Sequence, residues 1–285
     1  MTLQQAIQSA ADQLADDEQL AATARRDAET LLMHAAQLTR AQVLAHPTHQ
    51  IKADQLAAFE AAISRRLRHE PIQYITGQQE FYGLTLTVTP AVLIPRPETE
   101  HLVEAVLEHL PNDRPVTIVD IGTGSGAIAI ALASHLPQAE ITAIDLSSAA
   151  LDIARTNAHT HRVDGQIRFL LSDLLEALSP LQKMGYFDVI ASNPPYVPTS
   201  DSILLHPQVR EHEPSTALFA GPDGLEVYRR LIPQAQSALK PGGLLALEMG
   251  HGQRDTLADL LKGWANVCFL DDLQGIPRVV LAYRA

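Results

Sequence analysis

The chain has 285 residues, of which 46% are hydrophobic and 19% charged, and its formal net charge is −12. This composition is typical of a globular protein with one large or two ordinary domains. It argues against a protein that holds DNA by its phosphates, because such proteins need clustered Lys and Arg. No apolar stretch reaches the ~20 residues that span a bilayer, and the single cysteine, together with an N-terminus that lacks a targeting pattern, predicts a cytoplasmic protein. The twelve histidines lack a metal-ligand spacing, so we expect no metal.

Residues 1–70 have the pattern of helices only. Apolar residues recur at three- and four-residue spacing in "ARRDAETLLMHAAQL" and "ADQLAAFEAAISRRLRH", and Thr2 with Gln5 fits a capping box. The segment carries no catalytic constellation. We interpret it as a helical bundle that docks a partner, and a purely structural cap fits the pattern as well.

Residues 71–96 change period. The stretch "LTLTV" alternates strictly between apolar and polar residues after Gly83, which predicts a β-hairpin that links the two parts of the chain.

Residues 97–285 begin with the helix "PRPETEHLVEAVLEHL" and then alternate strands with helices. This alternation predicts an α/β domain with a Rossmann-like, mostly parallel sheet covered by helices on both faces. Ligands of such sheets bind outside the carboxyl ends of the strands. That rule brings four loops to one rim: "DIGTGSG", "AIDLS", "LSDLL" and "SNPPY".

The first of these loops is a glycine-rich turn between a strand and a helix, made of Gly122, Thr123, Gly124, Ser125 and Gly126. Glycines let a backbone turn tightly and approach a ligand. The spacing is neither the G-x-G-x-x-G of dinucleotide binders nor a P-loop. The sequence therefore predicts a close ligand approach without naming the ligand.

Two aspartates strengthen a nucleoside interpretation. Asp145 ends the next strand about 20 residues on, where a carboxylate can accept hydrogen bonds from ribose hydroxyls. Asp173 ends the strand after that, where it could bond the amine of adenine, although capping the following helix is an equally good explanation.

The fourth loop, "SNPPY", ends a strand with two prolines, which cannot continue a sheet ladder. The side-chain oxygen of Asn193 and the carbonyl of Pro194 are two acceptors that suit a planar NH2 group. Tyr196 offers a flat apolar wall. If the electrophile is a positively charged methyl donor, alignment of the nucleophile is the main catalytic device and no general base is needed.

These loops, in this order, resemble those of class I, S-adenosylmethionine-dependent methyltransferases that modify planar amino groups. The stretches "QYITGQQEFYG", "LIPRPETE", "VREHEPSTALFAGPDGLEVYRRLI" and "LKPGGLLALEMGHGQ" are similar to the release factor glutamine methyltransferases. This second resemblance covers the chain from about residue 70 to its end, and the first 70 residues match in size and character.

The resemblance implies methyl transfer to the side-chain amide nitrogen of the glutamine in the Gly-Gly-Gln motif of class 1 peptide chain release factors. It implies that the loop from Gly122 to Gly126 wraps the methionine part of S-adenosylmethionine, that Asp145 holds the ribose, and that Asp173 and Leu174 lie by the adenine. Leu174 stands where some relatives have an aromatic residue. The target glutamine would then be held by Asn193, Pro194, Pro195 and Tyr196. Asn193, Pro194 and Tyr196 would be the catalytic residues, and Asn193 would also contact the cofactor. Arg96 and Glu98 in "PRPETE" are expected at the rim without a catalytic role.

Four alternatives stay open. The same corner could methylate a ribosomal-protein glutamine, or the exocyclic amine of adenine or cytosine in DNA, although DNA enzymes need a basic groove that this acidic chain does not offer. A non-catalytic nucleoside-binding module would bind the cofactor without turnover. A nicotinamide oxidoreductase fits least, because the glycine spacing differs.

Overall fold

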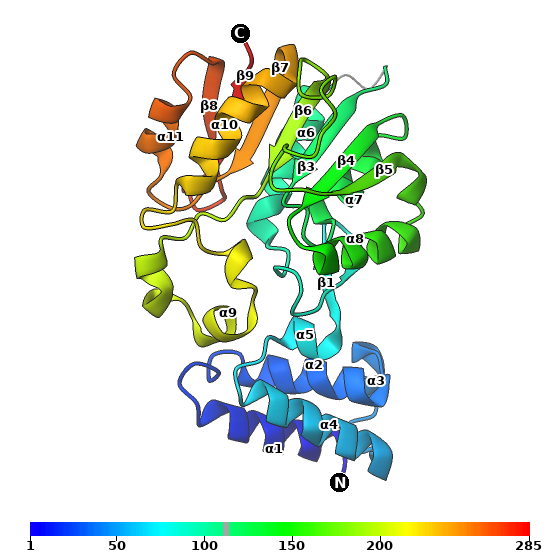
Figure 1. Cartoon of the computed structure of the whole chain (residues 1–285). Helices are drawn as coiled ribbons and strands as arrows, with labels where there is room; N and C mark the ends of the chain where they lie inside the picture. The colour runs from blue at the N-terminus through cyan, green and yellow to red at the C-terminus, as the bar shows by residue number, and fades with distance from the viewer. Residues whose placement is uncertain (111–113) are drawn as a thin grey trace. The chain divides into compact units, whose positions relative to one another are not determined.

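The computed structural model describes residues 1–110 and 114–285, which form two compact units (Figure 1). Unit 1 comprises Met1–Gln78 together with Leu204–His212, and unit 2 comprises Gln79–Ile203 together with Glu213–Ala285. Unit 1 is therefore built from two pieces of the chain. Among the described residues, no helix has the length and apolar character needed to cross a membrane.

Unit 1 is a bundle of short helices. The predicted capping box is confirmed: Thr2 Oγ1 accepts from the Gln5 N–H, and Gln5 Oε1 accepts from the Thr2 N–H. Leucines from the first two helices and the turn between them fill its core. Its helices are α1 (Leu3–Ala15), α2 (Ala24–Ala36), α3 (Arg40–Ala45), α4 (Ala53–Arg66), α5 (Ile72–Thr76) and α9 (Pro207–His212).

A buried arginine links the two pieces of unit 1. Arg66 Nε donates to Asp27 Oδ2 at 2.8 Å, and both side chains are almost fully buried. The same guanidinium donates to the side-chain oxygen of Gln208 on α9 at 3.2 Å. Helix α9 is thus held by a side chain from the end of α4.

The linking segment departs from its expected form at one end. The predicted hairpin is present as β1 (Gln78–Phe81) and β2 (Leu84–Thr87), but residues 72–76 form helix α5. Pro71 precedes this helix, and Gly77 ends it in the left-handed conformation at φ 76°. Both are local helix boundaries that the apolar, β-branched look of "IQYIT" obscures.

Unit 2 contains a seven-stranded sheet in the order β5-β4-β3-β6-β7-β9-β8, in which the first five strands are parallel. Strand β9 runs antiparallel to both of its neighbours. The predicted mostly parallel sheet is confirmed. Its strands are β3 (Thr117–Ile121), β4 (Glu140–Asp145), β5 (Ile167–Leu171), β6 (Phe187–Ser192), β7 (Leu239–Glu248), β8 (Ala265–Asp271) and β9 (Pro277–Tyr283).

Helices cover both faces of this sheet, each with its own apolar core. Helices α6, α7 and α8 contribute to one core, and α10 and α11 to the other. These helices are α6 (Glu100–His109), α7 (Ala127–His135), α8 (Ser148–Thr160), α10 (Glu226–Ala238) and α11 (Arg254–Leu260), with short 3₁₀ helices η1 (Pro97–Thr99), η2 (Asp164–Gln166), η3 (Thr199–Leu204) and η4 (Ser215–Ala217).

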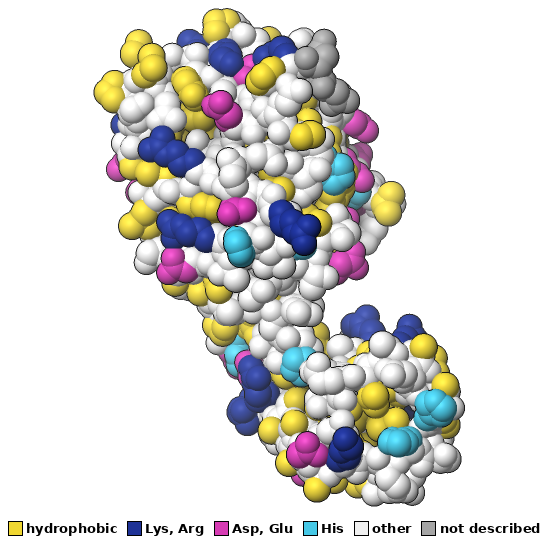
Figure 2. Space-filling model, turned by 90° about the vertical axis from the view of Figure 1, so that its right-hand side faces the viewer, with side chains coloured by type: hydrophobic (Ala, Val, Ile, Leu, Met, Phe, Trp, Pro, Cys, Tyr) yellow, Lys and Arg dark blue, Asp and Glu magenta, His cyan; other side chains and the backbone are white. Residues whose placement is uncertain are grey.

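The surface carries both signs of charge. On the face of unit 2 drawn in Figure 2, basic side chains are interspersed with acidic ones. The formal net charge of the whole chain is −12.

Candidate active site

A cleft of about 540 Å³ opens where β3, β4, β5 and β6 end. Residues from all four predicted loops line it, so the structure brings the loops together on one rim. Its volume lies within the ~300–1,000 Å³ that is usual for small-molecule sites. The walls are largely apolar, which leaves the few polar groups to orient a ligand.

The glycine-rich turn divides into residues that line the cleft and residues that hold the turn. Gly122 and Gly124 line the cleft with φ angles of 70° and 55°, and a Cβ built on Gly124 would meet no atom within 4 Å. Thr123 and Ser125 are buried and do not line it. A Cβ on Gly126 would lie 2.8 Å from Ile130, so this glycine serves the packing of α7.

A buried aspartate near the end of β3 holds the glycine-rich turn through hydrogen bonds. Asp120 Oδ2 accepts from Thr123 Oγ1 at 2.6 Å and from the Ala129 N–H at 3.2 Å. Its other oxygen is buried without a hydrogen-bond partner among the described residues. Burial raises the pKa of Asp120 to about 7.

Asp145 lines the cleft at the end of β4. Its Oδ2 accepts from the Gly124 N–H at 2.8 Å, and its Oδ1 accepts from the Ser147 N–H at 2.9 Å. Burial raises the pKa of this carboxyl, while the backbone donors act in the opposite direction. Each oxygen keeps a lone pair beyond the one used by the backbone, so the carboxylate can still receive two hydroxyls.

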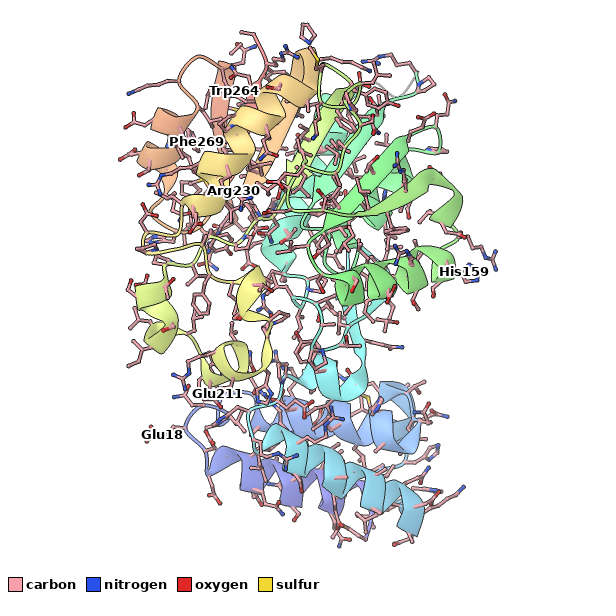
Figure 3. The ribbon with its side chains drawn as sticks, viewed as in Figure 1. Glu18, His159, Glu211, Arg230, Trp264 and Phe269 are labelled. Carbon is pink, nitrogen blue, oxygen red and sulfur yellow. The ribbon has the colours of Figure 1, made fainter. Side chains whose placement is uncertain are left out.

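Asp173 and Leu174 line the next part of the cleft. Asp173 Oδ2 accepts from Arg230 Nη2 at 2.6 Å. Arg230 lies on α10 (Figure 3) and also lines the cleft. Leu174 is mostly buried and adopts a positive φ of 48°. Arg230 therefore brings a planar cation to a position next to Asp173.

The proline corner offers the acceptors that the sequence predicted. Asn193, Pro194 and Pro195 line the cleft, whereas Tyr196 does not. Asn193 Nδ2 donates to Thr99 Oγ1 at 3.0 Å. Within the described part of the chain, no donor occupies Asn193 Oδ1 or the carbonyl oxygen of Pro194.

Tyr196 instead packs into the core on the α10 side, and its hydroxyl lies 3.4 Å from Glu248 Oε1. Burial raises the pKa of this phenol, and the neighbouring Glu248 adds to the effect. The ring therefore stiffens the corner from behind, while Pro195 forms the wall on the cleft side.

Two glycines leave room for the backbone and ring of Tyr196. A Cβ on Gly224 would lie 2.3 Å from the Tyr196 carbonyl oxygen, and one on Gly250 would lie 2.9 Å from its ring. Gln253 Nε2 donates to that carbonyl at 3.0 Å and to the carbonyl of Gly224 at 3.3 Å. The corner is thus fixed from the segment that follows β7.

A buried carboxylate at the end of β7, that of Glu248, contacts both Thr99 and Tyr196. Glu248 is 2% exposed, and its Oε2 accepts from Thr99 Oγ1 at 2.6 Å. Tyr228 on α10 donates to the Glu248 backbone carbonyl at 2.8 Å. Burial raises the pKa of Glu248 to about 7.

The segment "PRPETE" contributes an ion pair outside the cleft and one hydroxyl that contacts the proline corner. Arg96 forms an ion pair with the buried Glu213, whose other oxygen accepts from the Ile94 N–H. Neither Arg96 nor Glu98 lines the cleft. The residue of this segment that reaches the corner is Thr99.

Sequence reasoning missed Thr99, Glu248, Gln253 and Arg230. Glu248 carried a usable signal, because it ends a buried strand and the carboxyl ends of parallel strands meet on one rim. Thr99 lies in the segment "PRPETE", where the neighbouring charged residues are the more evident candidates. Arg230 and Gln253 belong to segments whose packing the pattern does not encode.

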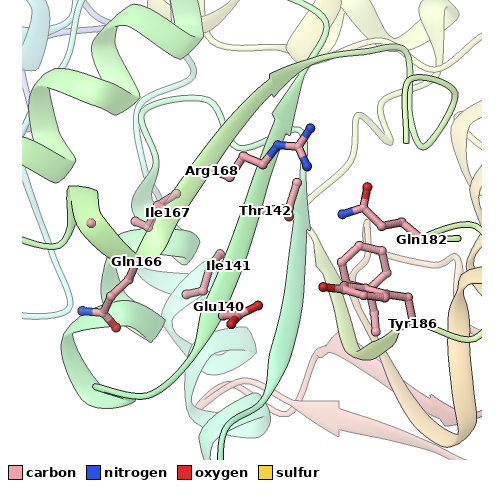
Figure 4. A pocket seen from close by; sticks show the side chains of 10 residues that line it. Glu140, Ile141, Thr142, Gln166, Ile167, Arg168, Gln182 and Tyr186 are labelled. Atoms are coloured by element: carbon pink, nitrogen blue, oxygen red, sulfur yellow. The ribbon is translucent and has the colours of Figure 1, made fainter. Parts of the chain in front are cut away.

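A second hollow of about 290 Å³ lies at the opposite ends of β4 and β5 (Figure 4). Glu140, Thr142 and Arg168 line it together with Gln182 and Tyr186. It contains none of the predicted site residues. Across the described ranges, no three His, Cys, Asp or Glu side chains gather as a metal ion would require.

Comparison with known structures supports the fold. The catalytic domain of hMettl16, solved in complex with the MAT2A 3′UTR hairpin 6, is 18% identical, with a TM-score of 0.57 over 72% of this chain and 77% of that one. A methyltransferase from Pyrococcus furiosus is also 18% identical, with a TM-score of 0.51 over 78% of this chain and 98% of that one. The sheet and its covering helices have the class I methyltransferase fold.

Comparison of sequences then identifies the family. Residues 5–77 match the model described as PrmC N-terminal domain, and residues 99–208 match the Methyltransferase small domain. The chain is 44% identical to the release factor glutamine methyltransferase of Koribacter versatilis, over 100% of this chain and 99% of that one. The corresponding protein of Moorella thermoacetica is 44% identical over the same shares. The chain belongs to the release factor glutamine methyltransferase family and is a methyltransferase.

Proposed function

We propose that this enzyme transfers a methyl group from S-adenosylmethionine to the side-chain amide nitrogen of the glutamine in the Gly-Gly-Gln motif of class 1 peptide chain release factors. The family supports the release factor as substrate, because relatives that match this chain over nearly their whole length are named release factor glutamine methyltransferases. The observation that carries the chemistry is the pair of unoccupied acceptors, Asn193 Oδ1 and the Pro194 carbonyl, beside the cleft.

The cleft residues fit the proposed cofactor. The open space over Gly124 would admit the methionine part, because no side chain fills it. The free lone pairs of Asp145 would accept the two ribose hydroxyls. Asp173 and Leu174 would border the adenine, with Arg230 beside them. Thr123, Ser125 and Gly126 act by shaping the turn.

When bound, S-adenosylmethionine supplies an electrophilic methyl group on a positively charged sulfur. The protein's own contribution is to orient the nucleophile. Asn193 and Pro194 each accept one hydrogen of the planar amide NH2, which fixes the direction of its nitrogen. Pro195 limits the space beside that group, and Tyr196 holds the corner rigid. Alignment of this kind can contribute several kcal/mol to a reaction between two bound groups, on the order of 7 kcal/mol in well-oriented cases.

Unit 1 is proposed to contribute to substrate docking. For the whole chain we propose a helical docking domain at residues 1–70, a hairpin segment at residues 71–96 and a methyltransferase domain at residues 97–285. The match to the PrmC N-terminal domain supports a family-specific role for this part. We expect no direct DNA binding, because the chain carries a formal net charge of −12, and no association with membranes.

Incubation with methyl-labelled S-adenosylmethionine tests the proposal. The purified enzyme is offered a class 1 release factor, the same factor with its Gly-Gly-Gln glutamine replaced by alanine, a ribosomal-protein fraction, or unmodified DNA. Label on the release factor that is absent from its glutamine variant is the expected result. Label only on the ribosomal fraction or on DNA would contradict the proposed substrate, and cofactor binding without label anywhere would contradict catalysis.

A further inference from the structure

A three-residue chain of hydrogen bonds reaches the target corner from behind. Glu248 Oε2 accepts from Thr99 Oγ1 at 2.6 Å, and Thr99 Oγ1 in turn accepts from Asn193 Nδ2 at 3.0 Å. Thr99 is 4% exposed and Glu248 is 2% exposed, so bulk water does not compete with either bond. The chain joins the start of α6, the end of β6 and the end of β7.

The direction of this chain follows from the chemistry of its end. An ionised carboxylate has no proton and can only accept, so the Thr99 hydroxyl must spend its single hydrogen on Glu248. Its oxygen is then available only as an acceptor, and the group that faces it must be the NH2 end of Asn193. The carboxamide oxygen of Asn193 is thereby turned toward the cleft.

We infer that Thr99 and Glu248 are positioning residues that determine which end of the Asn193 amide faces the substrate. The inference rests on the proposed function, because it matters only if a planar NH2 donor must meet an acceptor there. An amide turned the other way would present a donor to another donor. Both the bond and the alignment of the nucleophile would then be lost.

Protonation of Glu248 reverses the argument. A protonated carboxyl can donate to Thr99, which frees the Thr99 hydroxyl to donate to Asn193 and favours the opposite orientation of the amide. Charged and titratable groups face Glu248 from every element around it: Glu98 before α6, Tyr196 after β6, Tyr228 on α10 and Arg278 on β9. Burial raises the pKa of this carboxyl to about 7, Glu98 acts in the same direction, and Arg278 acts against it. Methyl transfer should therefore fall as the pH drops through this range.

The test is the full-length enzyme with Thr99→Val, which keeps the shape of the side chain but removes its hydroxyl. We expect kcat for release factor methylation to fall by about ten- to a hundredfold. The Kd for S-adenosylmethionine should stay within about twofold, because the residues proposed to hold it are unchanged. The KM for the release factor should change much less than kcat, because the bond to Asn193 is one contact among those that bind a folded protein. Thr99→Ser should restore most of kcat, since serine brings the hydroxyl back. Thr156→Val, the same change on an exposed turn of α8, controls for the loss of a threonine hydroxyl as such.

A second variant tests the pH dependence of kcat, which would not change if Glu248 had only a structural role. Glu248→Gln replaces the titrating carboxylate, which can only accept, by an amide that can present either an acceptor or a donor to Thr99. Its kcat should therefore lie below that of the wild type above pH 7, and the acid limb should be lost. An unchanged kcat in Thr99→Val, a Thr99→Ser variant as slow as Thr99→Val, or an acid limb that persists in Glu248→Gln would each overturn the inference. If the wild type labels no release factor, the proposed function itself fails, whereas a wild type that labels it and a Thr99→Val variant that matches it refute the positioning alone.

Discussion

Two residues of the cleft are proposed to separate catalysis from cofactor binding. Asn193→Ala should abolish turnover and leave the cofactor Kd nearly unchanged, because the side chain offers its free oxygen to the substrate. Asp145→Ala should do the reverse and weaken cofactor binding, because its carboxylate is the proposed ribose acceptor. Single-turnover methylation and titration calorimetry measure the two effects. Full turnover in Asn193→Ala would refute the proposed role of the corner.

Gly224 shows how closely the corner is packed. Its φ is +73°, and an alanine Cβ would lie 2.3 Å from the Tyr196 carbonyl oxygen. Gly224→Ala should lower the free energy of unfolding by about 2–4 kcal/mol, from the strain of the left-handed backbone and the collision together. It should also reduce turnover, because the carbonyl belongs to the corner.

A matched control separates strain from collision. Gly242 has nearly the same φ of +74°, but a Cβ there meets no atom within 4 Å. Gly242→Ala should cost only about 1 kcal/mol and leave turnover unchanged. Urea unfolding of the two variants measures the difference, and equal losses would show that the predicted collision is relieved by movement of the corner.

At the scale of elements, Asp188 joins three strands at the end of the sheet opposite the cleft. It accepts from the Thr117 N–H at 2.9 Å, from Arg114 at 3.1 Å and from Lys240 at 2.7 Å. Burial would raise the pKa of Asp188, but the bonds from Lys240, Thr117 and Arg114 together outweigh it and lower the pKa to about 2. The ionised carboxylate is therefore the stabilising form.

The sign of the pH dependence follows. Because the pKa is lower in the folded state, the contribution of Asp188 is fully present above about pH 4 and is lost as the pH falls toward 2. Asp188→Asn should cost about 2 kcal/mol at pH 7 and progressively less below pH 4. Asp152→Asn, at a side chain that is 74% exposed, should change stability by less than about 1 kcal/mol. A pH-independent loss in Asp188→Asn would show that packing rather than charge explains the effect.

Much of this arrangement could be predicted from local sequence, and the reason is topological. Parallel strands end on one rim, so the order of the elements along the chain is enough to place the glycine turn, Asp145 and the proline corner together. The pairs that orient them lie far apart in the chain: Thr99 is 149 residues from Glu248, and Arg96 is 117 residues from Glu213. Periodicity does not record such contacts. Helix α5 was not predicted for a local reason: its five residues are also common in strands.

At the scale of the whole molecule, the two units have separate cores, and ligand binding should stabilise only the unit that binds. The chain has one tryptophan, Trp264, which packs against the α10 core of unit 2 and therefore reports on that unit (Figure 3). S-adenosylmethionine at a hundred times its Kd should stabilise unit 2 by about 2.7 kcal/mol. The thermal midpoint from Trp264 fluorescence should rise, while far-ultraviolet circular dichroism should retain an unshifted component from unit 1. A single transition that shifts equally in both signals would contradict independent units.

The return of residues Leu204–His212 to unit 1 has a consequence for how the protein is made. A ribosome delivers the first 78 residues early, but Gln208, which accepts from Arg66, emerges only after strands β3 to β6. Strand β7, which lies beside β6 in the sheet, emerges later still. Neither unit can therefore be complete on a nascent chain that stops short of α9. Domains usually finish in order from the N-terminus; here the first unit to begin must wait for the second to be more than half synthesised.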